Sequence, residues 1–121
     1  MKLNWISIGA ALGALAVVLG AFGAHALKDR LTPEELEWWK TGVLYHMIHA
    51  IALVAFGLFA RERNAGIAGK CFLAGTAIFS GTLYGMALGG PRWLGAVTPI
   101  GGVLLIVGWL AFAVAARRLK V

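Results

Sequence analysis

Four long stretches without Asp, Glu, Lys or Arg constrain this chain of 121 residues more than any other feature. A helix of about 20 residues spans a hydrocarbon core about 30 Å thick, so each stretch is long enough to cross a membrane. Little of the chain remains for a separate soluble domain. The four stretches are Leu3 to Leu27, Thr41 to Ala60, Cys71 to Pro91 and Trp93 to Ala116.

The composition agrees with a membrane protein built of helices. Hydrophobic residues make up 60% of the chain and charged residues 13%, against about 25% charged in soluble proteins. Unpaired backbone amides are costly in lipid, and the alternating strands of a membrane barrel do not read as unbroken apolar runs. We therefore predict an all-α membrane protein, a single four-transmembrane-helix bundle over residues 1–121. The predicted spans are about 3–27, 41–60 with a helical extension from 33, 67–89 and 99–116.

The second helix is predicted to begin well before its apolar stretch. Thr32 suits the N-cap, Pro33 suits the first helical position, and Glu35 sits where it completes a capping box. Thr98 and Pro99 form a similar pair of cap and proline, which predicts the start of the fourth helix.

The basic residues predict the orientation of the helices. If the helices alternate in direction, seven basic residues lie on one side and four on the other, and the richer side is expected to be cytoplasmic. We therefore predict a multi-pass protein of the cell membrane with both termini in the cytoplasm. The basic residues form no stripe or block, so they do not indicate nucleic-acid binding. The seven are Lys2, Arg61, Arg63, Lys70, Arg117, Arg118 and Lys120, and the four are Lys28, Arg30, Lys40 and Arg92.

Small residues recur at helical spacing in the first and third predicted helices. In lipid they let two backbones approach closely, so we expect them to contact other helices. The predicted packing positions are Gly9, Gly13, Gly20, Gly81, Gly85 and Gly89. In the first helix a stripe of large residues occupies another face, which we expect to contact lipid. It consists of Trp5, Ile8, Leu12, Leu15 and Leu19.

Three histidines and Tyr84 are the candidate ligand-binding residues, because polar side chains at membrane depth are often functional. His25 lies near the end of the first helix, and His46 and His49 share one face of the second. With the predicted topology all four lie in the outer-leaflet half of the bundle. The opposite face of the second helix carries large apolar residues, which we expect to contact lipid. These are Leu44, Met47, Ile51, Val54 and Leu58.

Several kinds of site are compatible with these histidines. Imidazoles from two helices can bind zinc or copper, or a haem, and histidine can also carry protons in a transporter. Alternatively, each imidazole hydrogen-bonds a carbonyl or hydroxyl group across a helix contact. The sequence specifies no particular metal or cofactor.

Motifs typical of enzymes are absent from the chain. The apolar stretches hold no acidic residue, and GxSxG, P-loop and HExxH patterns do not occur. Cys71 is the only cysteine, which excludes an internal disulfide and a cysteine-cluster metal site. The sequence therefore favours a protein that is not an enzyme.

Three segments carry a resemblance to a known family: GAFGAHAL at 20–27, YHMIHAIAL at 45–53 and TPIGG at 98–102, followed by Gly108 and Trp109. With the four-span plan over nearly the entire chain, they resemble the small membrane proteins of the domain of unknown function 423 family, related to transmembrane protein 256 of animals. The resemblance implies the membrane fold and draws attention to the histidines. It implies no established activity.

These observations favour a membrane protein that acts by interaction, as an accessory or scaffold subunit. Its partners would be the lipid bilayer and either further copies of the chain or another membrane protein. A histidine-based binder of a metal, a haem or a small ligand is the second hypothesis. A small proton-linked transporter or an oligomeric channel is the third.

Overall fold

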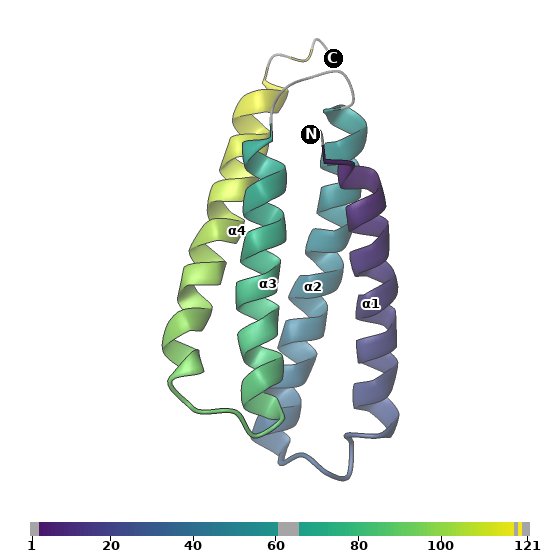
Figure 1. Ribbon diagram of the computed structural model, residues 1–121, viewed down its shortest axis with the longest axis vertical. Helices are drawn as coiled ribbons and strands as arrows, with labels where there is room; N and C mark the ends of the chain where they lie inside the picture. Colours follow the sequence, from purple (N-terminus) through teal and green to yellow (C-terminus); the bar gives the residue numbers. More distant parts are fainter. Residues whose placement is uncertain (1–2, 61–65, 118, 120–121) are drawn as a thin grey trace.

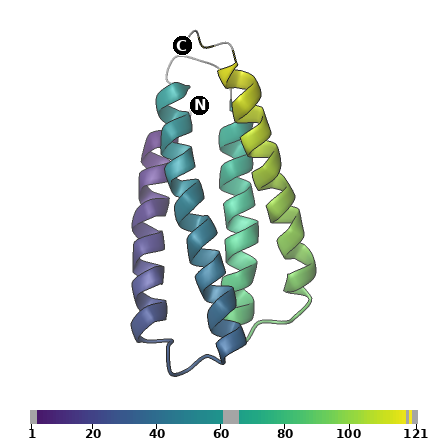
Figure 2. The ribbon, with the colours of Figure 1, turned by 180° about the vertical axis from the view of Figure 1, so that it is seen from behind.

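Four helices make up the computed structural model of the protein, which describes residues 3–60, 66–117 and 119. They are α1 (Trp5–His25), α2 (Pro33–Phe59), α3 (Ile67–Ala87) and α4 (Leu94–Ala116). Figure 1 shows them side by side, alternating in direction, and each helix packs against the next one in the chain. The view from behind shows the same order (Figure 2). The described part of the chain is therefore all-helical, as predicted.

Three of the four described helices, α1, α2 and α4, are long and apolar enough to cross a membrane. The third helix has a similar length of 21 residues. It is less apolar because it carries Lys70 and the hydroxyl residues Thr76, Ser80 and Thr82. Composition and length thus support three candidate spans.

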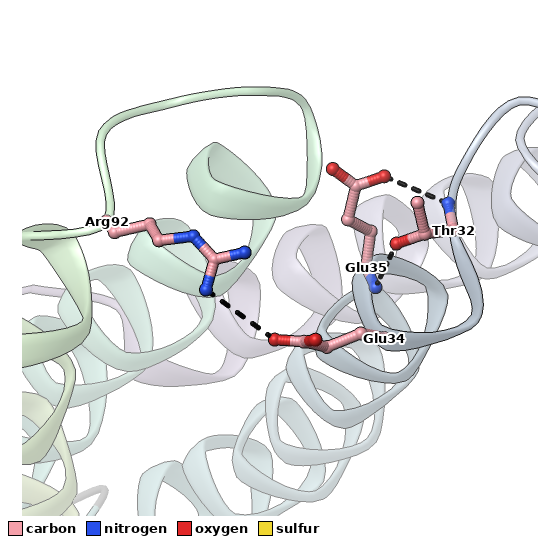
Figure 3. A network of polar contacts seen from close by, with 4 residues as sticks. All are labelled: Thr32, Glu34, Glu35 and Arg92. Atoms are coloured by element: carbon pink, nitrogen blue, oxygen red, sulfur yellow. Dashed lines mark hydrogen bonds and ion pairs between the residues drawn. The ribbon is translucent and has the colours of Figure 1, made fainter.

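The predicted capping box is present at the start of α2 (Figure 3). The Glu35 amide donates to Thr32 Oγ1 over 3.1 Å, and the Thr32 amide donates to Glu35 Oε1 over 2.9 Å. These bonds satisfy two backbone donors that the helix itself leaves without acceptors. Helix α2 can therefore begin at Pro33.

The loop between α3 and α4 contacts this same end of α2. Arg92 Nη1 lies 3.8 Å from Glu34 Oε1 (Figure 3), and the Arg92 guanidinium carbon lies 5.6 Å from the centre of the Trp38 ring. Both members of the ion pair are exposed, so the pair adds little stability by itself. It shows that the α1–α2 and α3–α4 connections lie at one end of the protein.

Helix α4 begins earlier than predicted. The amide of Leu94 donates to the Pro91 carbonyl, so helical bonding starts in the loop and Pro99 falls inside the helix. Because proline has no amide hydrogen, the Gly95 carbonyl lacks its usual helical donor. Thr98 is therefore not an N-cap, and its hydroxyl donates to the Leu94 carbonyl over 3.1 Å.

Helix α3 ends at Ala87, two residues before the predicted boundary. Gly89 adopts a φ of +97°, a left-handed conformation that side chains rarely tolerate. The Gly90 amide donates to the Gly85 carbonyl and the Gly89 amide to the Met86 carbonyl, which is the Schellman pattern. Gly89 therefore closes the helix, and a Cβ atom added there would meet no described atom of the chain within 4 Å.

The small residues Gly9, Gly13 and Gly20 of α1 face α2, as expected from their spacing. A Cβ atom added at Gly9 would lie 2.8 Å from the Val54 amide nitrogen and 2.9 Å from the Ala50 carbonyl oxygen. At Gly20 it would lie 3.3 Å from Val43 Cγ1, and at Gly13 it would meet only Ala50, at 3.9 Å. Of these three glycines, Gly9 therefore lies closest to the backbone of α2.

Of the predicted glycine stripe of α3, only Gly85 approaches another helix of the chain. A Cβ atom added at Gly81 would meet no atom within 4 Å, and at Gly85 it would meet only Leu94 Cδ1, at 3.2 Å. Gly81 therefore contacts neither neighbouring helix within the chain, whereas Gly85 lies beside Leu94 of α4. The tightest contacts between α3 and α4 are at Gly75, Gly101 and Gly108.

The large stripe of α1 contacts protein to a greater extent than predicted. Trp5, Ile8 and Leu12 pack against the large core cluster, and Leu19 packs against the small one. Only Leu15 is exposed. The prediction failed because α1 is covered both on the face of its small residues and on the adjacent face, where most of the large residues lie. The large core cluster is Ala52, Leu53, Phe56, Ala68, Phe72 and Leu105, and the small one is Leu27, Trp39 and Ala87.

The apolar face predicted for α2 is largely uncovered. Leu44, Ile51 and Leu58 are each more than half exposed, whereas Met47 and Val54 are half-buried. The opposite face, which carries both histidines, is buried. Helical phase therefore separated the two faces of α2 correctly.

Candidate functional site

Two histidines from α2 and hydroxyl residues from α3 form a polar layer between the two core clusters. His46 is 3% exposed, His49 is 4% exposed and Ser80 is 2% exposed, while Tyr84 is half-buried. Positions three or four apart on a helix share a face, which places both histidines against the neighbouring helices. The polar layer is thus enclosed by apolar packing on both sides along the bundle axis.

His46 is joined to α3 through Tyr84. Its Nδ1 atom lies 2.9 Å from the Tyr84 hydroxyl oxygen. The Tyr84 ring crosses Gly42, where an added Cβ atom would lie 2.7 Å from Tyr84 Cε1. On its other side the ring stacks at a tilt against Trp39, with ring centres 4.7 Å apart. Because Gly42 has no side chain, the Tyr84 hydroxyl group can reach His46.

His49 is joined to α4 through Trp109. The Trp109 indole N–H donates to His49 Nε2 over 3.0 Å, and His49 Nδ1 lies 2.7 Å from the Tyr45 carbonyl oxygen. An indole N–H can only donate and a carbonyl oxygen can only accept. The proton of the imidazole must therefore be on Nδ1, and this geometry requires the neutral ring.

Further hydrogen bonds join neighbouring helices. Trp39 Nε1 donates to the Leu19 carbonyl over 2.9 Å, which links α2 to α1. Ser80 Oγ donates to the Gly42 carbonyl over 2.7 Å, which links α3 to α2. The hydroxyl oxygens of Thr82 and Thr98 lie 2.6 Å apart and link α3 to α4. Most polar groups of the layer thus serve contacts between helices.

Two buried polar atoms of the layer make no hydrogen bond to protein groups. They are His46 Nε2 and Thr76 Oγ1. Thr76 is 4% exposed, so neither atom reaches bulk solvent. Leaving such a group unpaired costs roughly 1–3 kcal/mol.

His25 does not join the other candidate residues. It is exposed at the end of α1, whereas His46 and His49 are buried. Gly20 contacts Val43, so His25 lies eight residues further along the axis than the level of His46, about 12 Å at 1.5 Å per residue. The structure therefore does not bring His25 together with His46, His49 and Tyr84.

The described residues contain no group of three or more His, Cys, Asp or Glu side chains that could hold a metal ion. For His49 to bind a metal ion, its ring would first have to lose the hydrogen bond to Trp109 or the one to the Tyr45 carbonyl. The free nitrogen of the layer is His46 Nε2.

Sequence reasoning missed two members of the layer. Trp109 lies 60 positions from His49 in the chain, and no spacing rule connects residues on different helices. Gly42 lies on the histidine face of α2, but its role depends on the Tyr84 ring that crosses it.

Comparison with known sequences identifies the family. The family described as "Protein of unknown function (DUF423)" matches residues 19–102, which is more than half of the chain. The chain belongs to the DUF423 family. The match includes both buried histidines and Tyr84 and ends before Trp109. It confirms the resemblance found in the sequence.

Bacterial membrane proteins are similar to this DUF423 chain over nearly its full length. It is 43% identical to the UPF0382 membrane protein YwdK of Bacillus subtilis, over 94% of this chain and 96% of the relative. It is 37% identical to a UPF0382 membrane protein of Haemophilus influenzae, over 99% and 98%. It is 41% identical to the UPF0382 inner membrane protein YgdD of Escherichia coli, over 89% and 85%.

No solved structure matches this DUF423 chain. The names of its relatives and its three long apolar helices agree with one another. The chain is therefore a multi-pass protein of the cell membrane, as its sequence predicted.

Proposed function

We propose that this DUF423 protein crosses the membrane four times and has both termini in the cytoplasm. Helix α3 supports this number because it packs between α2 and α4, two candidate spans, and is as long as α1. The beginning of α1 and the end of α4 lie at the same end of the protein (Figure 1). Seven basic residues against four support the orientation.

Only two of the seven basic residues that support this orientation lie within the described residues, whereas all four of the others do. Lys70 and Arg117 lie at the start of α3 and just after α4, at the end that we assign to the cytoplasm. Lys28, Arg30, Lys40 and Arg92 lie at or near the opposite end. Five of the basic residues, Lys2, Arg61, Arg63, Arg118 and Lys120, lie outside the described residues.

Reporter fusions test this topology. A green fluorescent protein fused after Val121 is expected to fluoresce, and alkaline phosphatase at the same position is expected to be inactive. The matched control is the same pair of reporters fused after Asp29, in the α1–α2 connection, where we expect the reverse. Active phosphatase after Val121 would contradict the assignment.

We further propose that the protein acts by interaction within the membrane, as an accessory or scaffold subunit. The observation that carries this proposal is the open face of α3, where the small residues Ala74, Ala77 and Gly81 are exposed. A Cβ atom at Gly81 would meet no neighbour. Because van der Waals packing drives association of helices in lipid, such a face favours close approach of another helix.

The hydrogen bonds of His49 make a histidine-based metal or haem site the weaker hypothesis. Both ring nitrogens already have protein partners, and the bond to Trp109 joins α2 to α4. Binding a metal there would disconnect two helices. Interaction through an uncovered helix face requires no such change.

Replacing Gly81 with leucine tests the interaction function. The added side chain enters open space in the single chain, and leucine favours a helix more than glycine does, so the melting temperature is expected to equal or exceed that of wild type. Association with further copies or with a membrane partner is expected to fall strongly. Single-molecule photobleaching in vesicles and quantitative co-purification measure these two forms of association.

Ala10→Leu is the matched control, since Ala10 is an exposed small residue on α1, away from the open face of α3. It should leave both melting and association unchanged. Equal association of wild type and Gly81→Leu would show that the open face of α3 is not the contact surface.

A further inference from the structure

Two unpaired polar atoms in one buried layer are the basis of an inference beyond the proposed interaction. His46 Nε2 and Thr76 Oγ1 come from different helices, and neither has a hydrogen-bond partner in the protein. His46 is 3% exposed and Thr76 is 4% exposed. An imidazole nitrogen or a hydroxyl group without a partner is strongly disfavoured in a membrane interior.

The register between α2 and α3 places these two residues at the same level. Ser80 Oγ donates to the Gly42 carbonyl, which aligns these two positions. The helices run in opposite directions (Figure 1). His46 lies four residues after Gly42 in α2, and Thr76 lies four residues before Ser80 in α3. Because the helices are antiparallel, both steps go the same way along the bundle, so His46 and Thr76 are at the same level on facing helices.

We propose that His46 Nε2 and Thr76 Oγ1 hold a single buried water molecule between α2 and α3. Buried waters make about three hydrogen bonds, typically to polar groups that otherwise have none. Water can donate to one of these groups and accept from another, which neither an anion nor a metal ion can do. The water gives both unpaired atoms a partner and joins α2 to α3.

Solid-state NMR of the labelled protein in lipid vesicles tests this site through magnetisation transfer from water to the histidine rings. We expect rapid transfer to His46 and at least threefold slower transfer to His49, whose nitrogens are both bonded to protein groups. The exposed His25 serves as the positive control. Transfer to His25 without transfer to His46 would overturn the proposal.

Thr76→Val removes the hydroxyl group and keeps the shape of the side chain. If the water is present, this variant loses a partner for it, so transfer to His46 falls and the melting temperature drops by roughly 3 °C or more. If the hydroxyl group has no partner, replacing it with a methyl group leaves the melting temperature unchanged or raises it. That second result would overturn the site, as would unchanged transfer to His46.

Thr82→Val controls for the loss of any hydroxyl group in α3, since Thr82 is bonded to Thr98 and to its own helix. It should lower the melting temperature and leave water transfer to His46 unchanged. Because neither readout depends on partners in the membrane, failure of this proposal is distinguishable from failure of the interaction function.

Discussion

Gly101→Ala is expected to destabilise the protein by roughly 1–3 kcal/mol, because one methyl group does not fit between α3 and α4. The new Cβ atom would clash with the Phe79 amide nitrogen and lie 2.9 Å from the Gly75 carbonyl oxygen. Both are backbone atoms, so no rotation of a side chain relieves the contact. The two helices would have to separate.

The neighbouring glycine provides a matched control for this prediction. At Gly102 an added Cβ atom would lie 3.7 Å from Phe79 Cδ2, an ordinary contact. Alanine improves helix propensity at both positions by up to about 1 kcal/mol, so any difference between the variants reports packing. Reversible unfolding in dodecyl sulfate, followed by circular dichroism, measures it. Equal stability of the two variants would contradict the close contact at Gly101.

Trp109→Phe is expected to cost roughly 1–3 kcal/mol, because it leaves His49 Nε2 buried without a donor. His49→Phe removes the bond from the other side. It does not leave the Tyr45 carbonyl unpaired, since that oxygen also lies within the hydrogen-bonded ladder of α2. His49→Phe also leaves the Trp109 indole N–H without its acceptor, so each single variant strands one polar group of the pair.

A double-mutant cycle isolates the bond between these residues. Hydrogen bonds between membrane helices measured in this way average about 0.6 kcal/mol and reach about 1.7 kcal/mol. The double variant Trp109→Phe with His49→Phe is thus expected to lose less stability than the sum of the single variants. Strict additivity would mean that the indole and the imidazole do not interact in the folded protein.

The number of helices and most of their boundaries could be predicted from the sequence. In lipid the backbone must bond within its own helix, so the uncharged stretches indicate the helices directly. The capping box at Thr32 and Glu35 is equally local, because its partners are three positions apart. The start of α4 could not be read this way, since backbone bonds from the loop begin the helix before Thr98 and Pro99.

The buried face of α2 was predictable, and its hydrogen bonds were not. Helical spacing places His46 and His49 opposite Leu44 and Ile51, and the structure buries the first pair and exposes the second. Which group each imidazole meets depends on the register of α3 and α4 against α2. No pattern along one helix contains that register.

The glycines show the same division between local and tertiary information. By itself the sequence determined a membrane-spanning, all-helical protein of the DUF423 family with buried histidines on α2, because burial and backbone bonding follow from hydrophobicity and helical periodicity. Only the tertiary structure decided that Gly101 lies in a close contact while Gly81 lies on an open face, that Gly89 ends a helix, and that His49 bonds to Trp109. Small residues recur on more than one side of α3 and α4, and the side that packs depends on how the helices are rotated against one another.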